Sequence, residues 1–197
     1  MPNRLSGIEY ARAYVERLTT ILQSLDYEAV ARVMDLFLEA RANGNTIFLL
    51  GNGGSAATAA HFANDLSVCA SPEDHTPFRA ISLTANTPLI TCLANDFGYE
   101  TIFSRQLRTI MQPGDVVVGI SASGNSPNAV KAMEYANDEG GVSVAIVGFD
   151  GGLMKKIATH VIHVETDKGE YGPVEDVHMV LDHLISTYLA AIDTARR

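Results

Sequence analysis

Residues 46–66, TIFLLGNGGSAATAAHFANDL, run from an apolar segment through five small residues into an alanine-rich segment. The apolar run at 47–50 predicts a buried strand, residues 51–55 predict a loop, and the segment after them predicts a helix. A short loop of this kind leaves backbone N–H groups and the positive end of the helix facing open space. The stretch therefore predicts an α/β fold with an anion site where this helix begins.

The composition is that of a globular protein with one domain. A chain of 197 residues can bury the core of a three-layer α/β domain, and 47% hydrophobic with 19% charged residues excludes disordered and fibrous classes. The net charge of −9, without a lysine or arginine cluster, argues against nucleic-acid binding. Two cysteines without CxxC spacing, and no secretory or membrane-spanning segment, predict a reduced, cytoplasmic protein.

The rest of the chain alternates between predicted helices and predicted strands. Two amphipathic helices come first, at 5–25 and 27–42. We expect Asp26 to be the N-cap of the second helix and Gly44 to mark its C-terminal stop. The strand at 47–50 is followed by four more, at 79–83, 115–120, 142–147 and 160–164. Helices are expected at 87–94 and 100–111, between the second and third strands, and a helix at 175–192 ends the pattern. This rhythm predicts five parallel strands under the right-handed crossover rule. We expect residues 1–44 to be a helical extension of a core at 45–197, which either packs against another subunit or covers one sheet edge.

A second loop of small polar residues, SASGNS at 121–126, follows the strand at 115–120. If the two strands before these loops are neighbours, both following helices direct their N-termini at the same region. A single such loop is usually a turn or a helix cap. Two of them favour a site for one phosphate monoester, with hydroxyl donors from Ser55, Ser121, Ser123 and Ser126.

Two nucleotide sites are less compatible with the first loop. Gly51, Gly53 and Ala56 satisfy the G-x-G-x-x-A spacing of dinucleotide-binding loops. That interpretation also needs an acidic residue after the second strand to bind the ribose, whereas the strand at 79–83 continues into Thr84, Ala85 and Asn86. A nucleoside triphosphate loop needs a lysine followed by serine or threonine, which this loop lacks.

Two helices carry side chains suited to proton transfer. His61 and Asp65 are four residues apart and share a helix face, either as a hydrogen-bonded polar pair or as reactive groups beyond the anion loop. On the last helix, Glu175 and His183 fall within roughly 80° of each other, whereas His178 lies about 140° from His183. We therefore expect His183 to face the same side as Glu175, and His178 to face another.

Four stretches resemble the sugar isomerase (SIS) domain family, and among its members the phosphoheptose isomerases. They are GNGGSAATAAHFANDL at 51–66, LTANTPLITCLANDFGYETIFSRQL at 83–107, PGDVVVGISASGNSPNAVKA at 113–132 and VEDVHMVLDHLI at 174–185. The resemblance implies a single SIS domain over 1–197, with a flavodoxin-like five-stranded parallel sheet, in a homotetramer with active sites at subunit contacts. It implies an aldose–ketose isomerase that interconverts sedoheptulose 7-phosphate and D-glycero-D-manno-heptose 7-phosphate through an enediolate, for heptose biosynthesis.

The resemblance also implies which residues act. A zinc ion, one per subunit, would be held by His61, Asp65, Glu175 and His183, where the family has glutamate for Asp65 and glutamine for Glu175. A shared metal requires Glu175 and His183 to lean together across about 12 Å of helix rise. Asp65 would be the general base and His183 the general acid. Substrate contacts are implied for Asn52, Gly53, Gly54, Ser55, Asn95, Asp96, Ser121, Ala122, Ser123, Ser126 and Glu175.

Two other functions stay open at the level of the sequence. A non-enzymatic relative that associates with the bacterial replication initiator uses the same domain as a scaffold, although it lacks a histidine matching His183. An isomerase or binding protein for another phosphosugar is also compatible with the changes at Asp65 and Glu175. Neither nucleic acid nor a membrane is an expected partner.

Overall fold

The computed structural model describes residues 6–71 and 75–195. Five strands form one parallel sheet in the order β2-β1-β3-β4-β5. Two of its inner strands, β1 and β3, are buried along their whole length, as their almost unbroken apolar sequences require. The predicted five-stranded parallel sheet is confirmed, with strands β1 (Thr46–Leu50), β2 (Arg79–Ser82), β3 (Val116–Ser121), β4 (Val142–Val147) and β5 (His160–His163).

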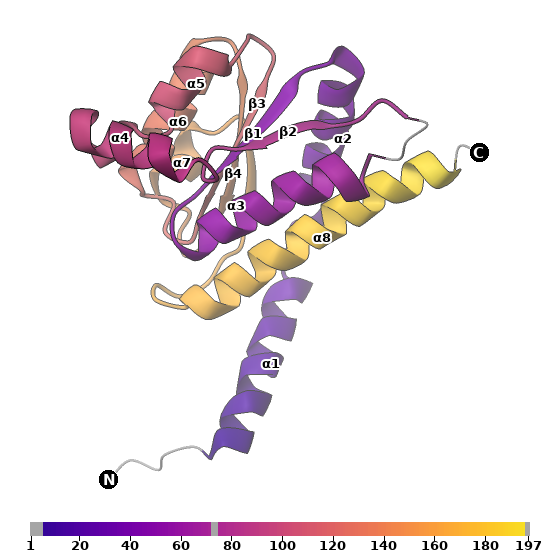
Figure 1. Ribbon diagram of the computed structural model, residues 1–197. Coiled ribbons are helices and arrows are strands. Elements are labelled where there is room, and N and C mark those ends of the chain that lie inside the picture. Colours follow the sequence, from indigo (N-terminus) through magenta and orange to yellow (C-terminus); the bar gives the residue numbers. More distant parts are fainter. Residues whose placement is uncertain (1–5, 72–74, 196–197) are drawn as a thin grey trace.

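Helices cover both faces of the sheet (Figure 1). The first face packs against α2 (Tyr27–Asn43), α3 (Gly54–Asn64) and α8 (Tyr171–Ala195). The second packs against α4 (Thr87–Phe97), α5 (Ser104–Ile110), α6 (Pro127–Asp138) and α7 (Gly152–Ile157). Successive residues of a strand point into opposite cores, with Leu49 in the first and Phe48 in the second. The predicted three-layer sandwich is confirmed.

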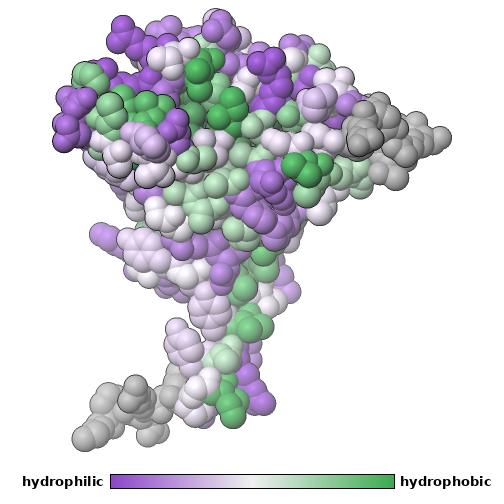
Figure 2. Space-filling view, viewed as in Figure 1, coloured by the Kyte–Doolittle hydropathy of each residue, from purple (hydrophilic) through white to green (hydrophobic). Residues whose placement is uncertain are grey.

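The two N-terminal helices differ in how they pack. Helix α2 begins at the predicted N-cap Asp26 and ends at the left-handed Gly44, and Phe37 on its inner face is fully buried. Helix α1 (Gly7–Gln23) projects from the body (Figure 1), and Ile21 is its one buried residue in the structure. Apolar side chains lie along this projection (Figure 2). Helix α2 is thus one of the helices that cover the sheet, and α1 alone extends away from it.

Three local features differ from the predicted pattern. The segment expected as one helix at 100–111 is a 3₁₀ turn, Tyr99–Thr101, followed by α5. Helix α8 begins at Tyr171 and not at Glu175. A π-helical turn, η1 (Asp65–Cys69), follows α3, closed by the amide of Ala70, which donates to the carbonyl of Asp65 at 2.9 Å.

No helix among residues 6–71 and 75–195 is both long and apolar enough to cross a membrane.

Candidate active site

A pocket of about 220 Å³ lies where the chain reverses its direction of travel across the sheet. The chain proceeds from β1 to β2 on one side and then returns to β3 on the other. Open α/β sheets bind ligands at the carboxyl ends of two such strands. The two small-residue loops, at 51–55 and 121–126, lie together here, and the pocket is lined by Asn52, Ser55, Ile120, Ser121, Ala122, Ser123, Ser126, Tyr171 and Glu175.

The pocket offers hydrogen-bond donors from two helix starts. Helix α3 begins at Gly53 (φ 54°) and α6 begins at Ser126, and among the described contacts neither start has a side-chain hydrogen bond that caps it. Backbone N–H groups in the first turn of α3 are therefore available to an anion. In α6, Pro127 has no N–H and the Ala129 amide donates to Asn128 Oδ1 at 2.9 Å, which leaves the amide of Asn128. The buried Ser121 hydroxyl accepts from the amide of Gly124 at 3.1 Å and lies 3.4 Å from the Ser126 hydroxyl.

Of three other predicted substrate contacts, Asn52 lines the pocket, whereas Asn95 and Asp96 lie outside it. The Asn52 amide is held by reciprocal hydrogen bonds of 2.9 Å with Asn128, and its oxygen also accepts from the Tyr99 hydroxyl. Asn95 and Asp96 are exposed on α4, where Asn95 Nδ2 donates to Asp96 Oδ1 at 2.7 Å, and neither residue lines this pocket. The structure thus gathers the residues of the two loops but not the pair on α4.

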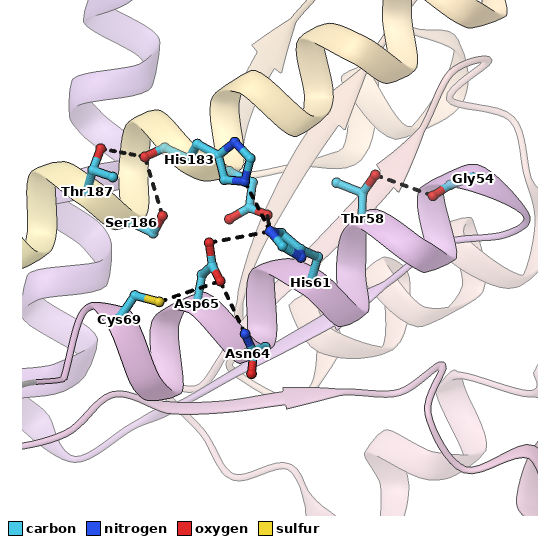
Figure 3. Close-up of polar contacts among 10 residues, drawn as sticks. Gly54, Thr58, His61, Asn64, Asp65, Cys69, His183, Ser186 and Thr187 are labelled. Carbon is cyan, nitrogen blue, oxygen red and sulfur yellow. Dashed lines mark hydrogen bonds and ion pairs between the residues drawn. The ribbon is translucent and has the colours of Figure 1, made fainter.

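A second polar group lies farther along α3, where α8 runs beside it (Figure 1). The nitrogen His61 Nε2 is at its centre, 3.0 Å from His183 Nε2 and 3.5 Å from Asp65 Oδ2 (Figure 3). The fourth member is Asp182, whose Oδ2 lies 3.9 Å from the same nitrogen. One ligand atom from each of these four residues lies within 4.8 Å of the other three.

This group contains three of the four predicted metal ligands, and Glu175 is not among them. The α3 and α8 helices run in the same direction, so Glu175 faces Gly54 at the start of α3 while His183 faces His61 two turns later. The Glu175 carboxylate approaches so closely that a Cβ on Gly54 would collide with it. Glu175 therefore belongs to the pocket of the two loops, and the helix rise separates it from the histidines.

Asp182 was missed by the sequence reasoning although the sequence contains a signal for it. It lies seven residues after Glu175, two turns along α8, and therefore on nearly the same face. Its neighbours Leu181 and Ile185 are fully buried core residues. An acidic residue in such an apolar helix segment, directly beside a candidate catalytic histidine, marks a site.

The environment of Asp182 is unfavourable for a carboxylate on its own. Its side chain is fully buried, and neither oxygen has a hydrogen-bond partner among the described residues. Burial, and to a smaller extent the charge of Asp65, raise the pKa of Asp182 to about 7. A buried carboxylate without partners is costly unless a cation compensates it. Two imidazoles and two carboxylates form a donor set that suits a divalent metal ion, and this orphaned carboxylate fits such an ion.

His178 is the other buried polar group of α8 that lacks partners. Both ring nitrogens are without a hydrogen bond in the described structure, and burial lowers the pKa of His178 to about 4. Above pH 6.5 the ring is neutral in the folded and the unfolded chain. Below it the unfolded chain binds a proton that the folded chain does not, so stability falls with falling pH.

Between pH 7 and pH 5 we expect His178 to account for a loss of about 2 kcal/mol in the free energy of unfolding, at about 1.36 kcal/mol for each pKa unit. Urea unfolding at both pH values, in buffer with a chelator, measures it. The variant His178→Leu should lose correspondingly less over the same interval. An equal loss in the two proteins would exclude His178 as the cause.

Comparison with known proteins agrees with this architecture. A family model described as the SIS domain matches residues 9–148. A phosphoheptose isomerase of Akkermansia muciniphila is 42% identical over 160 residues, covering 81% of this chain and 82% of that protein. A probable phosphoheptose isomerase of Thermoplasma acidophilum is 37% identical over 89% and 94% of the two chains. The structure of phosphoheptose isomerase GmhA from Neisseria gonorrhoeae superposes with a TM-score of 0.86 at 28% identity, over 94% and 100%.

Proposed function

This chain belongs to the SIS domain family and groups with the phosphoheptose isomerases in it, and from that premise we propose that it is a sugar-phosphate isomerase. The resemblance identified from its four motifs is confirmed. The proposed reaction interconverts sedoheptulose 7-phosphate and D-glycero-D-manno-heptose 7-phosphate. One observation supports it most: the anion pocket and the His61 group lie on the same two helices, about 9 Å of helix rise apart. An open-chain ketose phosphate can extend from one to the other.

The pocket of the two loops would hold the phosphate. Hydroxyl groups of Ser55, Ser121, Ser123 and Ser126, with amides at the starts of α3 and α6, can donate to its oxygens without a lysine. Glu175 lies at the wall of this pocket, where its carboxylate would accept a hydrogen bond from a sugar hydroxyl. Asn95 and Asp96, the other proposed substrate contacts, are exposed on α4 outside this pocket.

At the far end of the sugar, Asp65 would act as the general base and His183 as the general acid. Asp65 takes the proton from C1 of the ketose while His183 protonates O2, which gives the enediol. Return of a proton to C2, with loss of the O1 proton, then gives the aldose. His61 lies within 3.5 Å of both groups and can orient them.

A divalent metal, proposed to be one zinc ion per subunit, would be held between α3 and α8 by His61, Asp65 and His183. When bound, such an ion supplies positive charge that stabilises the enediolate. The donor types and the orphaned carboxylate beside them support the proposal.

The proposed setting of the enzyme follows the same resemblance. We propose one SIS domain over 1–197 in a cytoplasmic homotetramer. The projecting α1, with Ile8 and Val15 more than half exposed, supports a subunit contact, because a free apolar helix face is usually covered. The free thiols of Cys69 and Cys92 support a reducing compartment.

Purified protein supplied with zinc is expected to convert sedoheptulose 7-phosphate to the aldose phosphate, and not to convert unphosphorylated sedoheptulose. The variant Ser126→Ala should raise KM by about tenfold or more with little change in kcat, since it removes one hydrogen bond to a charged group. Coupled assays and NMR of the product measure both. If the protein converts another ketose phosphate but not the heptose phosphate, the proposed substrate is wrong. If it converts no ketose phosphate at all, the protein is a binding scaffold and not an isomerase.

A further inference from the structure

We propose that Asp182 is a direct ligand of the metal ion and that it takes the place expected for Glu175. The inference rests on the proposed metal site of the isomerase and assigns its fourth protein ligand. It rests on the geometry of this chain, because the resemblance implied Glu175 for that position and gave Asp182 no role.

The positions of the donor atoms favour Asp182 over Glu175. Asp182 brings a carboxylate oxygen within 4.8 Å of the ligand atoms of His61, Asp65 and His183. Glu175 lines the loop pocket two turns earlier on α8, beside Gly54. A ligand at Glu175 would have to cross the rise of two helical turns, about 11 Å, to reach the same ion. Asp182 needs no such movement.

The burial of Asp182 points to a cation. Its side chain is completely removed from solvent, and both oxygens lack hydrogen-bond partners among residues 6–71 and 75–195. The one cationic candidate within 4 Å of it in this group is His61, at 3.9 Å, which is too long for a hydrogen bond. As metal ligands, two neutral imidazoles and the ionised carboxylates of Asp65 and Asp182 would carry a formal charge of −2. One divalent ion would neutralise that charge and give the orphaned Asp182 carboxylate a partner.

This ligand set has a consequence for substrate binding. Because Asp182 supplies the fourth donor, Glu175 keeps its carboxylate for the sugar at the wall of the loop pocket. The set contains two oxygen and two nitrogen donors, so manganese and cobalt should also bind. Their affinities should follow the general order for divalent metals, with manganese weaker than cobalt.

The experiment compares metal binding by the full-length wild-type protein, Asp182→Asn and Glu175→Gln. Both variants remove one carboxylate from α8 with almost no change in size. Zinc is titrated calorimetrically into chelator-treated protein, and cobalt(II) is added separately to record its visible absorption, which reports the ligand set. We expect Asp182→Asn to weaken zinc binding at least about tenfold and to change the cobalt spectrum. Glu175→Gln should keep both within about threefold of wild type while raising KM for the sugar phosphate.

A second readout is the unfolding temperature, measured with and without metal. Without metal, Asp182→Asn should unfold at a higher temperature than wild type, because the buried carboxylate has no compensating charge. With saturating zinc, the order should reverse, because only the wild type gains the full binding energy.

The outcomes separate the inference from the proposed function. The assignment of Asp182 would be wrong if Asp182→Asn kept the zinc affinity and cobalt spectrum of the wild type. It would also be wrong if Glu175→Gln lost zinc affinity and changed the cobalt spectrum. In either case the metal site itself would stand. No zinc binding by wild type would overturn the metal site and Asp182 with it, and isomerase activity measured in chelator would then show that the reaction stands without it.

Discussion

Replacing Asp65 by asparagine is expected to lower kcat by about 10²- to 10⁴-fold, which is the usual contribution of a positioned general base. The carboxylate is nearly buried at the start of the π-helical turn η1, with Oδ2 3.5 Å from His61 Nε2 and Oδ1 accepting from the Asn64 amide at 3.2 Å. Asparagine keeps the size of the side chain and cannot accept the C1 proton. Initial rates with sedoheptulose 7-phosphate at saturating zinc measure the effect.

Two further variants control this result. Asp65→Glu keeps a carboxylate and should retain activity well above that of Asp65→Asn, although a displacement of about 1 Å can cost on the order of a hundredfold. His183→Ala should lose activity to a similar extent, and the double variant should be little worse than either single one, since the two groups act in one proton transfer. A rate in Asp65→Asn within about threefold of wild type would show that the base is another residue.

Replacing Gly124 by alanine is expected to destabilise the fold by about 2–4 kcal/mol and to abolish phosphate binding. Gly124 has φ 62°, and its carbonyl accepts from the amide of Met154 at 2.9 Å. A Cβ there would collide with the backbone carbonyl of Gly151, which no side-chain rotation relieves. The loop at 121–126 would have to move away from the start of α7, and the hydroxyls of Ser121 and Ser126 would move with it. Thermal unfolding and inorganic phosphate binding measure the two effects.

Gly140 provides the matched control. It also has positive φ, 76°, but an added Cβ would make only an ordinary contact of 3.5 Å with Pro113. Gly140→Ala should therefore cost about 1 kcal/mol, the left-handed strain alone, with phosphate binding unchanged. Equal losses in the two variants would mean that conformational strain, and not the clash with Gly151, sets the cost at Gly124.

The sheet and the meeting of the two small-residue loops in one pocket could be predicted because each depends on local sequence. Apolar runs such as 115–120 define the buried strands, and the small-residue loops follow directly from them. The ligand set could not be predicted in full, because it depends on how α3 is aligned with α8. A helical wheel gives angles around one helix but not which turn of its neighbour lies opposite. It therefore grouped Glu175 with His183 and gave no role to Asp182.

The π-helical turn and the break before α5 were also beyond the sequence. The amide of Ala70 bonds five residues back to Asp65, and the 3₁₀ turn at Tyr99–Thr101 precedes Ile102 and Phe103, which are buried in the second core. Both irregularities satisfy packing between segments distant in the chain. Residue propensities along a single segment contain no record of such packing.

Because α3 and α8 run side by side, the distance along them between groups on one face can change only by whole helical turns. Side chains on one face recur only once per turn, about every 5.4 Å, whereas a sugar grows by a far smaller step with each carbon. Shifting a reactive group to the next turn would overshoot the change in length from a seven-carbon to a six-carbon phosphate. Adaptation to sugars of other lengths must therefore come from the loops at 51–55 and 121–126, which can be adjusted in small steps, while the spacing of side chains along the helices stays the same.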